Sequence, residues 1–304
     1  MDDELAWADD DDGHGCDRLE IHRGAPMTQV HPFDAYVQAQ SDNLRVAHAA
    51  LLFALDRFPD IAVDEYLKRL DHLADRVATH NPTTPEDRVS ALQEVLVRRH
   101  GLTGCTSDFC DPCGSYLNRV LDRGHGLPIA LCAVWLDVAA TLGWELHGVG
   151  MPGHFLIACP SSGPERIFID PFGGGKTLDR SGCAELLCRC FGQTVELAES
   201  HLAPVSDRSL LSRMLCNLRS LYCASQHWRF ARTGAPAAPR IILVTANWSR
   251  KSAGCAPCLQ EQNGPLVPCS ARRHHLDRSQ KICQNVLFCP RHGQEALNNY
   301  ATNA

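Results

Sequence analysis

The sequence predicts an α+β fold in which helices surround a short antiparallel sheet. Three observations lead to this prediction. Residues 32–100 follow helical periodicity, residues 128–142 form an almost wholly apolar helical stretch, and three short β-like runs come after it. Because the runs are joined by connections too short to hold a crossover helix, neighbouring strands should pair antiparallel. Helices followed by such a sheet are typical of the α+β class.

The composition excludes several classes of protein. Of the 304 residues, 44% are hydrophobic, which is enough for a sizeable core, and the net charge of -6 provides no basic field for nucleic acid. No run approaches the roughly 18 apolar residues that a membrane helix needs, and the acidic start does not resemble a secretion signal. We therefore expect a cytoplasmic protein whose 16 cysteines are mostly reduced thiols.

The first two segments are an acidic leader and a helical region. Residues 1–30 contain the run Asp9–Asp12 and are expected to be disordered, whereas residues 31–102 should form helices. One helix has an apolar residue every three or four positions: Val63, Tyr66, Leu67, Leu70, Leu73 and Val77. The next begins at Thr84, with Pro85 and Asp87 as start signals, and ends before Gly101.

The core segment is predicted at 103–205. A short helix over 116–122 leads to the helix at 128–142, where Asp137 is the charged residue, so this helix should be buried on all sides. The β-like runs are 145–151, 154–160 and 166–171.

Two segments are expected after the core. Residues 206–232 should form further helices, because Leu210, Leu211, Met214, Leu215, Leu218 and Leu221 recur at helical spacing. Residues 233–304 carry cysteines, histidines and prolines without a sustained period, so an irregular tail is predicted there.

Three motifs occur in a telling order: GLPIALC opens the apolar helix, GHF opens one β-like run, and IDP closes another. This order resembles the transglutaminase-like superfamily, which has a papain-like site. There, a G-x-Cys turn places a thiol at a helix start, a histidine acts as base, and an acid orients the histidine. The resemblance implies these last two roles for His154 and Asp170. It also places Pro128 where the nucleophilic cysteine would stand.

Longer strings resemble the SirB-type branch of this superfamily more closely. They are YLNRVLDRGHGLPIAL, VGMPGHFL, FIDPFGGG and PVSDRSLLSRMLCNL. Over about residues 33–230, the resemblance implies a helical N-terminal region and a tetratricopeptide-like end, here truncated to 206–232. Proline at the turn is characteristic of that branch.

Each site residue also has an ordinary structural interpretation. His154 could be a half-buried histidine, Asp170 could start a turn, and proline is favoured at the first position of a helix. Taken together on neighbouring strands, His154 and Asp170 are interpreted as an orienting pair. Gly126, Pro128 and Gly153 would then line the cleft, with donors expected from free backbone N–H groups at the Gly126–Pro128 turn.

Two functions stay open. The first is a non-catalytic scaffold or binding module that presents this cleft to a protein or peptide partner. The second is an enzyme: a cysteine-type hydrolase or acyltransferase using Cys132, His154 and Asp170, or a hydrolase in which His154 activates water. Cys132 lies one turn deeper than Pro128, inside an apolar helix that would leave its thiol inert, so the binding module is preferred.

Neither a cofactor nor a metal is expected. Cys105, Cys110 and Cys113 form C-x4-C-x2-C, but no second pair follows at zinc-finger spacing. The string DPFGGGKT resembles a phosphate loop, but the position five residues before Gly175 is occupied by Asp170 and not by glycine. We interpret its glycines as a tight turn.

Overall fold

The computed structural model describes residues 30–40, 44–105, 111–163 and 165–224. The predicted leader lies outside this range except for Val30, and the predicted tail lies wholly outside it. The N-terminal region is helical, as predicted, with the following elements: α1 (Pro32–Ala39), α2 (Val46–Ala54), α3 (Val63–Ala78), α4 (Pro85–Leu92) and the π-helical segment η1 (Gln93–Arg99).

The start of α4 follows the sequence signals. Thr84 Oγ1 accepts the Asp87 N–H at 3.1 Å and Asp87 Oδ2 accepts the Thr84 N–H at 3.0 Å, so a capping box satisfies the first turn. The predicted single helix changes to π-helical geometry at Gln93 and is followed by Gly101 at φ +63°. The boundaries were therefore predictable, whereas the change of helix type was not.

The core segment begins with small elements that lead to the buried helix. These elements are β1 (Thr103–Gly104), η3 (Pro112–Ser115), α5 (Leu117–Arg123) and β2 (His125–Gly126). Strands β1 and β2 pair in parallel and were not predicted, because strands of two residues show no alternation.

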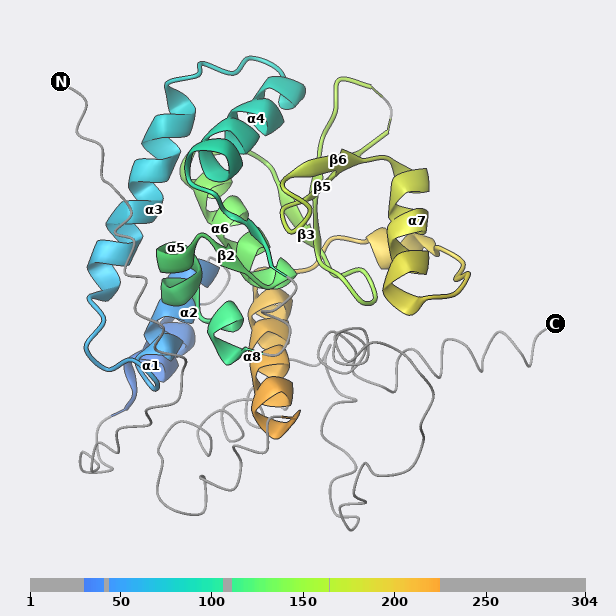
Figure 1. The fold of residues 1–304 in the computed structure, drawn as a ribbon. Helices are drawn as coiled ribbons and strands as arrows, with labels where there is room; N and C mark the ends of the chain where they lie inside the picture. The colour runs from blue at the N-terminus through green and yellow to red at the C-terminus, as the bar shows by residue number, and fades with distance from the viewer. Residues whose placement is uncertain (1–29, 41–43, 106–110, 164, 225–304) are drawn as a thin grey trace, which may run out of the picture.

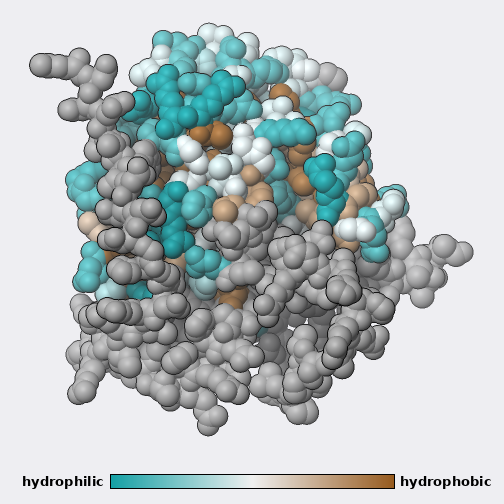
Figure 2. Space-filling model, viewed as in Figure 1, coloured by the Kyte–Doolittle hydropathy of each residue, from teal (hydrophilic) through white to brown (hydrophobic). Residues whose placement is uncertain are grey.

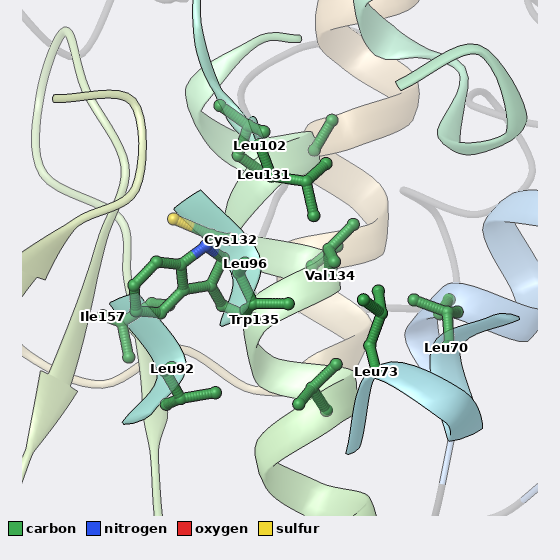
Figure 3. Close-up of a cluster of buried hydrophobic side chains, with 14 of the residues drawn as sticks. Leu70, Leu73, Leu92, Leu96, Leu102, Leu131, Cys132, Val134, Trp135 and Ile157 are labelled. Atoms are coloured by element: carbon green, nitrogen blue, oxygen red, sulfur yellow. The ribbon is translucent and has the colours of Figure 1, made fainter. Parts of the chain in front are cut away.

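Helix α6 (Pro128–Thr141) is the central element of the fold. Figure 1 shows it between the N-terminal helices and the sheet. Its side chains are buried nearly all round, as its apolar composition predicts. Figure 3 shows Leu131 and Val134 on the side of Leu73, while Trp135 lies toward Ile157 of the sheet.

The sheet is antiparallel, in the order β3-β4-β5-β6. Its strands are β3 (His147–Val149), β4 (Leu156–Cys159), β5 (Ile167–Asp170) and β6 (Lys176–Leu178). Ile157 and Ile169 are paired and belong to the core around α6, whereas Leu156 and Phe168 pack with α7 (Arg180–Phe191). One helix layer thus covers each face (Figure 1).

Strand β6 corrects the prediction of three strands. Only Leu178 of its three residues is buried, so the segment has no apolar alternation that the sequence could reveal.

The chain continues through η4 (Glu199–Leu202) into α8 (Asp207–Ala224), which packs against α2 and η3. The predicted helix at 206–232 is therefore seen up to Ala224, where the described residues end. Among the coloured residues of Figure 2, hydrophilic side chains predominate, with hydrophobic side chains visible between them. In the described ranges, no helix is long and apolar enough to cross a membrane.

Candidate functional site

A tight turn between β3 and β4 positions His154. The His154 N–H donates to Met151 O at 3.1 Å, Pro152 occupies the second position, and Gly153 follows with φ +74°. These are the features of a type II turn, which requires a left-handed residue at its third position. The sequence Met-Pro-Gly-His therefore specifies the backbone that presents the histidine. His154 was expected to open the strand. It closes this turn instead, because β4 begins at Leu156.

His154 and Asp170 form a buried pair. His154 Nε2 lies 2.8 Å from Asp170 Oδ1, and the two residues are 5% and 8% exposed. Their predicted hydrogen bond is thus present. Because a carboxylate only accepts hydrogen bonds, Nε2 is the nitrogen that carries the proton toward Asp170, and the neutral form of the ring has a lone pair on Nδ1. Within the described ranges Nδ1 makes no hydrogen bond, so it can accept one from a ligand.

The loop after Asp170 is shaped around its carboxylate. A Cβ atom at Gly173 would lie 2.6 Å from Asp170 Oδ2, and the Gly175 N–H donates to Asp170 O at 2.8 Å. Gly174 and Gly175 have φ values of +72° and +75° and lead directly into β6. The glycines form the predicted tight turn, and the adjoining strands are antiparallel.

Phe172 forms one wall beside the histidine. Its ring stands edge to face with the His154 ring, with centroids 5.8 Å apart and an interplanar angle of 88°. Its carbonyl oxygen accepts the Gly104 N–H at 3.0 Å, and a Cβ atom at Gly104 would lie 2.3 Å from the ring. Phe172 therefore bridges β1 and His154, and the pair is more enclosed than an open cleft.

The turn before α6 differs from expectation in its hydrogen bonds. Pro128 is the first residue of the helix, as predicted, and Leu127 is the N-cap. The Leu127 N–H donates to Gly114 O at 2.8 Å and is therefore not a free donor. A Cβ atom at Gly126 would lie 2.5 Å from Val120 Cγ2, so this glycine is required for close packing.

Cys132 is part of the apolar core. Its thiol is 0% exposed and donates to Phe155 O at 3.5 Å; Figure 3 shows it among the buried side chains. Burial raises the pKa of Cys132 well above its usual range, and the charge of Asp170 raises it further, whereas Arg213 acts in the opposite direction. A thiol with a raised pKa is a poor nucleophile at neutral pH.

The described residues offer no metal centre. Among them, no group of three or more His, Cys, Asp or Glu side chains could hold a metal ion. Cys132, Cys159 and Cys183 are buried free thiols, as predicted, while Cys113 is in a disulfide, which was not predicted. Cys110 and the cysteines of the tail lie outside the described ranges.

Sequence reasoning missed two residues around the pair. Phe172 adjoins Asp170 in the FIDPFGGG string but has no chemical signature of its own. Arg213 lies in PVSDRSLLSRMLCNL, and its Nη2 donates to Met151 O and His154 O at 3.0 and 3.1 Å. No periodicity or spacing rule connects residues so far apart in the sequence.

The fold and the site define a class: an α+β protein in which a histidine from a turn pairs with an aspartate at the end of a strand, next to a buried helix. The sequence pattern of the transglutaminase-like superfamily matches residues 64–216, which are just over half of the chain. The chain belongs to this superfamily.

Bacterial relatives support the assignment. A UPF0162 protein of Xylella fastidiosa is 31% identical over 71% of this chain and 77% of its own length. A UPF0162 protein of Pseudomonas aeruginosa is 32% identical over 58% of this chain and 64% of its own. Human F-box only protein 21 is 32% identical over 44% of this chain and 21% of its own length. No solved structure matches the chain.

Proposed function

We propose that this protein is a non-catalytic transglutaminase-like binding module that uses its His154–Asp170 pair to hold a protein or peptide partner. One observation carries the proposal: α6 begins with Pro128, which has no thiol, and Cys132 on the same helix is fully buried. The site thus keeps an oriented base without an accessible nucleophile.

The chemistry of acyl transfer explains why this matters. A covalent mechanism needs a thiolate within reach of the base. In a serine protease, removal of the nucleophile lowers turnover by on the order of a million-fold, so His154 and Asp170 alone would retain little covalent activity. Binding remains possible, because Nδ1 of His154 can accept a hydrogen bond from a peptide N–H group.

The enclosure of the pair limits how a ligand can approach. The side chains of His154 and Asp170 are 6% and 11% exposed. A partner would therefore contact the pair along one edge, beside the Phe172 ring. We expect an extended peptide segment to fit this approach better than a bulky side chain.

The finer family assignment belongs to the same proposal. We place the chain in the SirB-type branch, with α8 as part of a truncated tetratricopeptide-like end, and we expect a cytoplasmic location and no cofactor. The match to F-box only protein 21 covers a fifth of that longer protein. A domain that makes up a small part of a longer protein is in keeping with a role in binding other protein segments.

A second candidate is a cysteine-type hydrolase or acyltransferase that uses Cys132. One observation favours it. The Cys132 thiol donates a hydrogen bond to the carbonyl oxygen of Phe155, the residue after His154, so the thiol lies near the backbone that carries the histidine. Its burial opposes this function, because the substrate would have to reach a thiol inside the core. A hydrolase in which His154 activates water would need the same enclosed pair to admit water and substrate together.

Thiol alkylation of the native full chain separates these candidates. Iodoacetamide modification is followed at each cysteine by mass spectrometry between pH 6 and 9, with the partly exposed Cys190 reporting that the reagent is active. We expect Cys132 to stay unmodified until the protein unfolds. Rapid alkylation of Cys132 that slows in His154→Ala would establish the enzyme instead.

Peptide selection tests the binding function directly. The immobilised full chain is used to select from a random peptide library, and enriched peptides are measured against wild type, Asp170→Asn and a distant surface variant, Glu65→Gln. We expect Asp170→Asn to weaken binding while Glu65→Gln does not. Peptides that bind all three proteins equally would place the binding surface elsewhere.

A further inference from the structure

Arg213 on α8 reaches the turn that presents His154. Its Nη2 group donates to Met151 O at 3.0 Å and to His154 O at 3.1 Å. These two carbonyl groups belong to the first and last residues of the turn, which is itself closed by the His154 N–H to Met151 O bond. One side chain therefore joins both ends of the turn.

The guanidinium group is also confined from its other sides. Its central carbon lies 5.5 Å from the centroid of the Phe155 ring, which is a cation–π distance. A Cβ atom at Gly150 would lie 2.8 Å from Arg213 Nη1, so any side chain there would displace the guanidinium group. Two hydrogen bonds, an aromatic face and a glycine thus define one position for the group.

The geometry points to Arg213 as the positioning residue of the site. By fixing the backbone of residues 151–154, it holds the His154 ring where Nε2 meets Asp170 Oδ1 at 2.8 Å. Helix α8 is then part of the site through the contact of Arg213 with the turn. This inference rests on the proposed function, because positioning has a purpose only if the pair binds a ligand.

A purely structural role makes a different prediction. Leu210 and Met214 of the same helix belong to the core around α6, so they attach α8 to the protein without bonding to the turn. If Arg213 only helped to attach the helix, its substitution would affect the His154 site no more than substitution of Met214 does. Lysine at 213 would keep the charge, but its shorter side chain ends in a compact ammonium group that cannot reach both carbonyls and also stack a planar group on the Phe155 ring.

Nuclear magnetic resonance of the ¹⁵N-histidine-labelled full chain can measure the site without a ligand. The His154 Nε2–H signal is assigned by its absence in His154→Gln, and its exchange with water is timed. We expect Arg213→Lys and Arg213→Gln to speed this exchange by about tenfold or more, because glutamine lacks the charge and lysine lacks the reach and planar group that hold the turn. Met214→Ala, matched for loss of melting temperature, should leave the exchange rate near that of wild type.

Two results would overturn the inference: wild-type exchange in a folded Arg213→Lys protein, or equal acceleration in Met214→Ala. If the Arg213 variants do not fold, Gly150→Ala tests the same contact with the arginine retained, and it should also speed exchange. The measurement does not depend on peptide binding. If the Arg213 variants speed exchange but peptide selection finds no peptide that binds, only the binding function is rejected. If peptides bind the site but the Arg213 variants exchange like wild type, only the role of Arg213 is rejected.

Discussion

Arg45, the N-cap of α2, holds both carboxylate oxygens of Asp137 on the central helix. Arg45 Nε lies 2.9 Å from Asp137 Oδ1, and Nη2 lies 2.8 Å from Oδ2. Nη2 also lies 2.8 Å from Asp71 Oδ1 on α3. The charged residue in the otherwise apolar stretch of α6 is thus paired in a bidentate geometry, which connects three helices.

Removal of Arg45 should strongly destabilise the fold. The Asp137 side chain is 4% exposed, so Arg45→Ala leaves a buried carboxylate without its cation, and we expect a loss of about 3 kcal/mol. Asp71→Ala is the matched control. Its carboxylate is 50% exposed, so its removal should cost about 1 kcal/mol or less. Denaturant unfolding measures both, and equal losses would contradict this account of the pair.

A second prediction concerns the turn that carries His154. Gly153→Ala places a side chain at φ +74° and a Cβ atom 2.9 Å from Cys190 Cβ, whereas Gly192→Ala at φ +67° meets no atom within 4 Å. We expect the strain alone to cost about 1–2 kcal/mol at Gly192. Overpacking should add about 1–3 kcal/mol at Gly153. The two unfolding free energies give the comparison, and a smaller loss in Gly153→Ala would show that the turn relaxes freely.

The sequence predicted those parts of the fold that depend on local chemistry. The Thr84 capping box, the proline at the first position of α6 and the apolar length of that helix are local signals, and each gave an element at the expected place. Strand β6 was missed because only one of its three residues is buried, and the β1–β2 pair was missed because strands of two residues show no alternation.

The site was predictable only as far as its chemistry-bearing residues. His154 and Asp170 could be paired from strand order, and their hydrogen bond followed. The packing of Phe172 on Gly104 and the bonds of Arg213 to the turn depend on contacts that no periodicity encodes. For the same reason, the sequence could not show that the Leu127 N–H is already bound by Gly114 O.

Cys159 should make stability depend on alkaline pH. Burial raises the pKa of Cys159 from its ordinary 9.0 to about 11, with the charge of Glu86 acting in the same direction and Arg88 opposing it. The folded state therefore keeps a proton that the unfolded state loses first. The resulting stability is complete below pH 9.0 and is lost as the pH rises toward about 11.

The test compares wild type with Cys159→Ala. The unfolding free energy of both proteins should fall in this pH window because other groups also titrate, but the fall should be shallower in the variant. A separate prediction concerns Cys132 as a core residue: Cys132→Ala should lower the free energy of unfolding by about 1 kcal/mol or less at neutral pH. Parallel pH profiles for wild type and Cys159→Ala would show that this thiol does not contribute.

The last prediction tests whether Pro128 occupies the place of a nucleophile. In Pro128→Cys, a new thiol stands at the first position of α6, where the helix dipole favours the thiolate, and we expect His154 to favour it further. Its apparent pKa should fall below about 8.5, the lower end of the values of an unperturbed thiol. The pH profile of alkylation gives this pKa separately from accessibility, which matters because Pro128 is buried.

Pro85→Cys is the matched control, because Pro85 is also the first residue of a helix. We expect Pro85→Cys to show the effect of the helix start alone, and Pro128→Cys to show a lower pKa that rises again when His154→Ala is added. Proteins with Cys132→Ala in the background exclude a contribution from that thiol. If Pro128→Cys and Pro85→Cys titrate alike, and His154→Ala changes neither, then Pro128 does not face the histidine. The pair would then have to be explained as part of the core, because nothing would connect it to the start of α6.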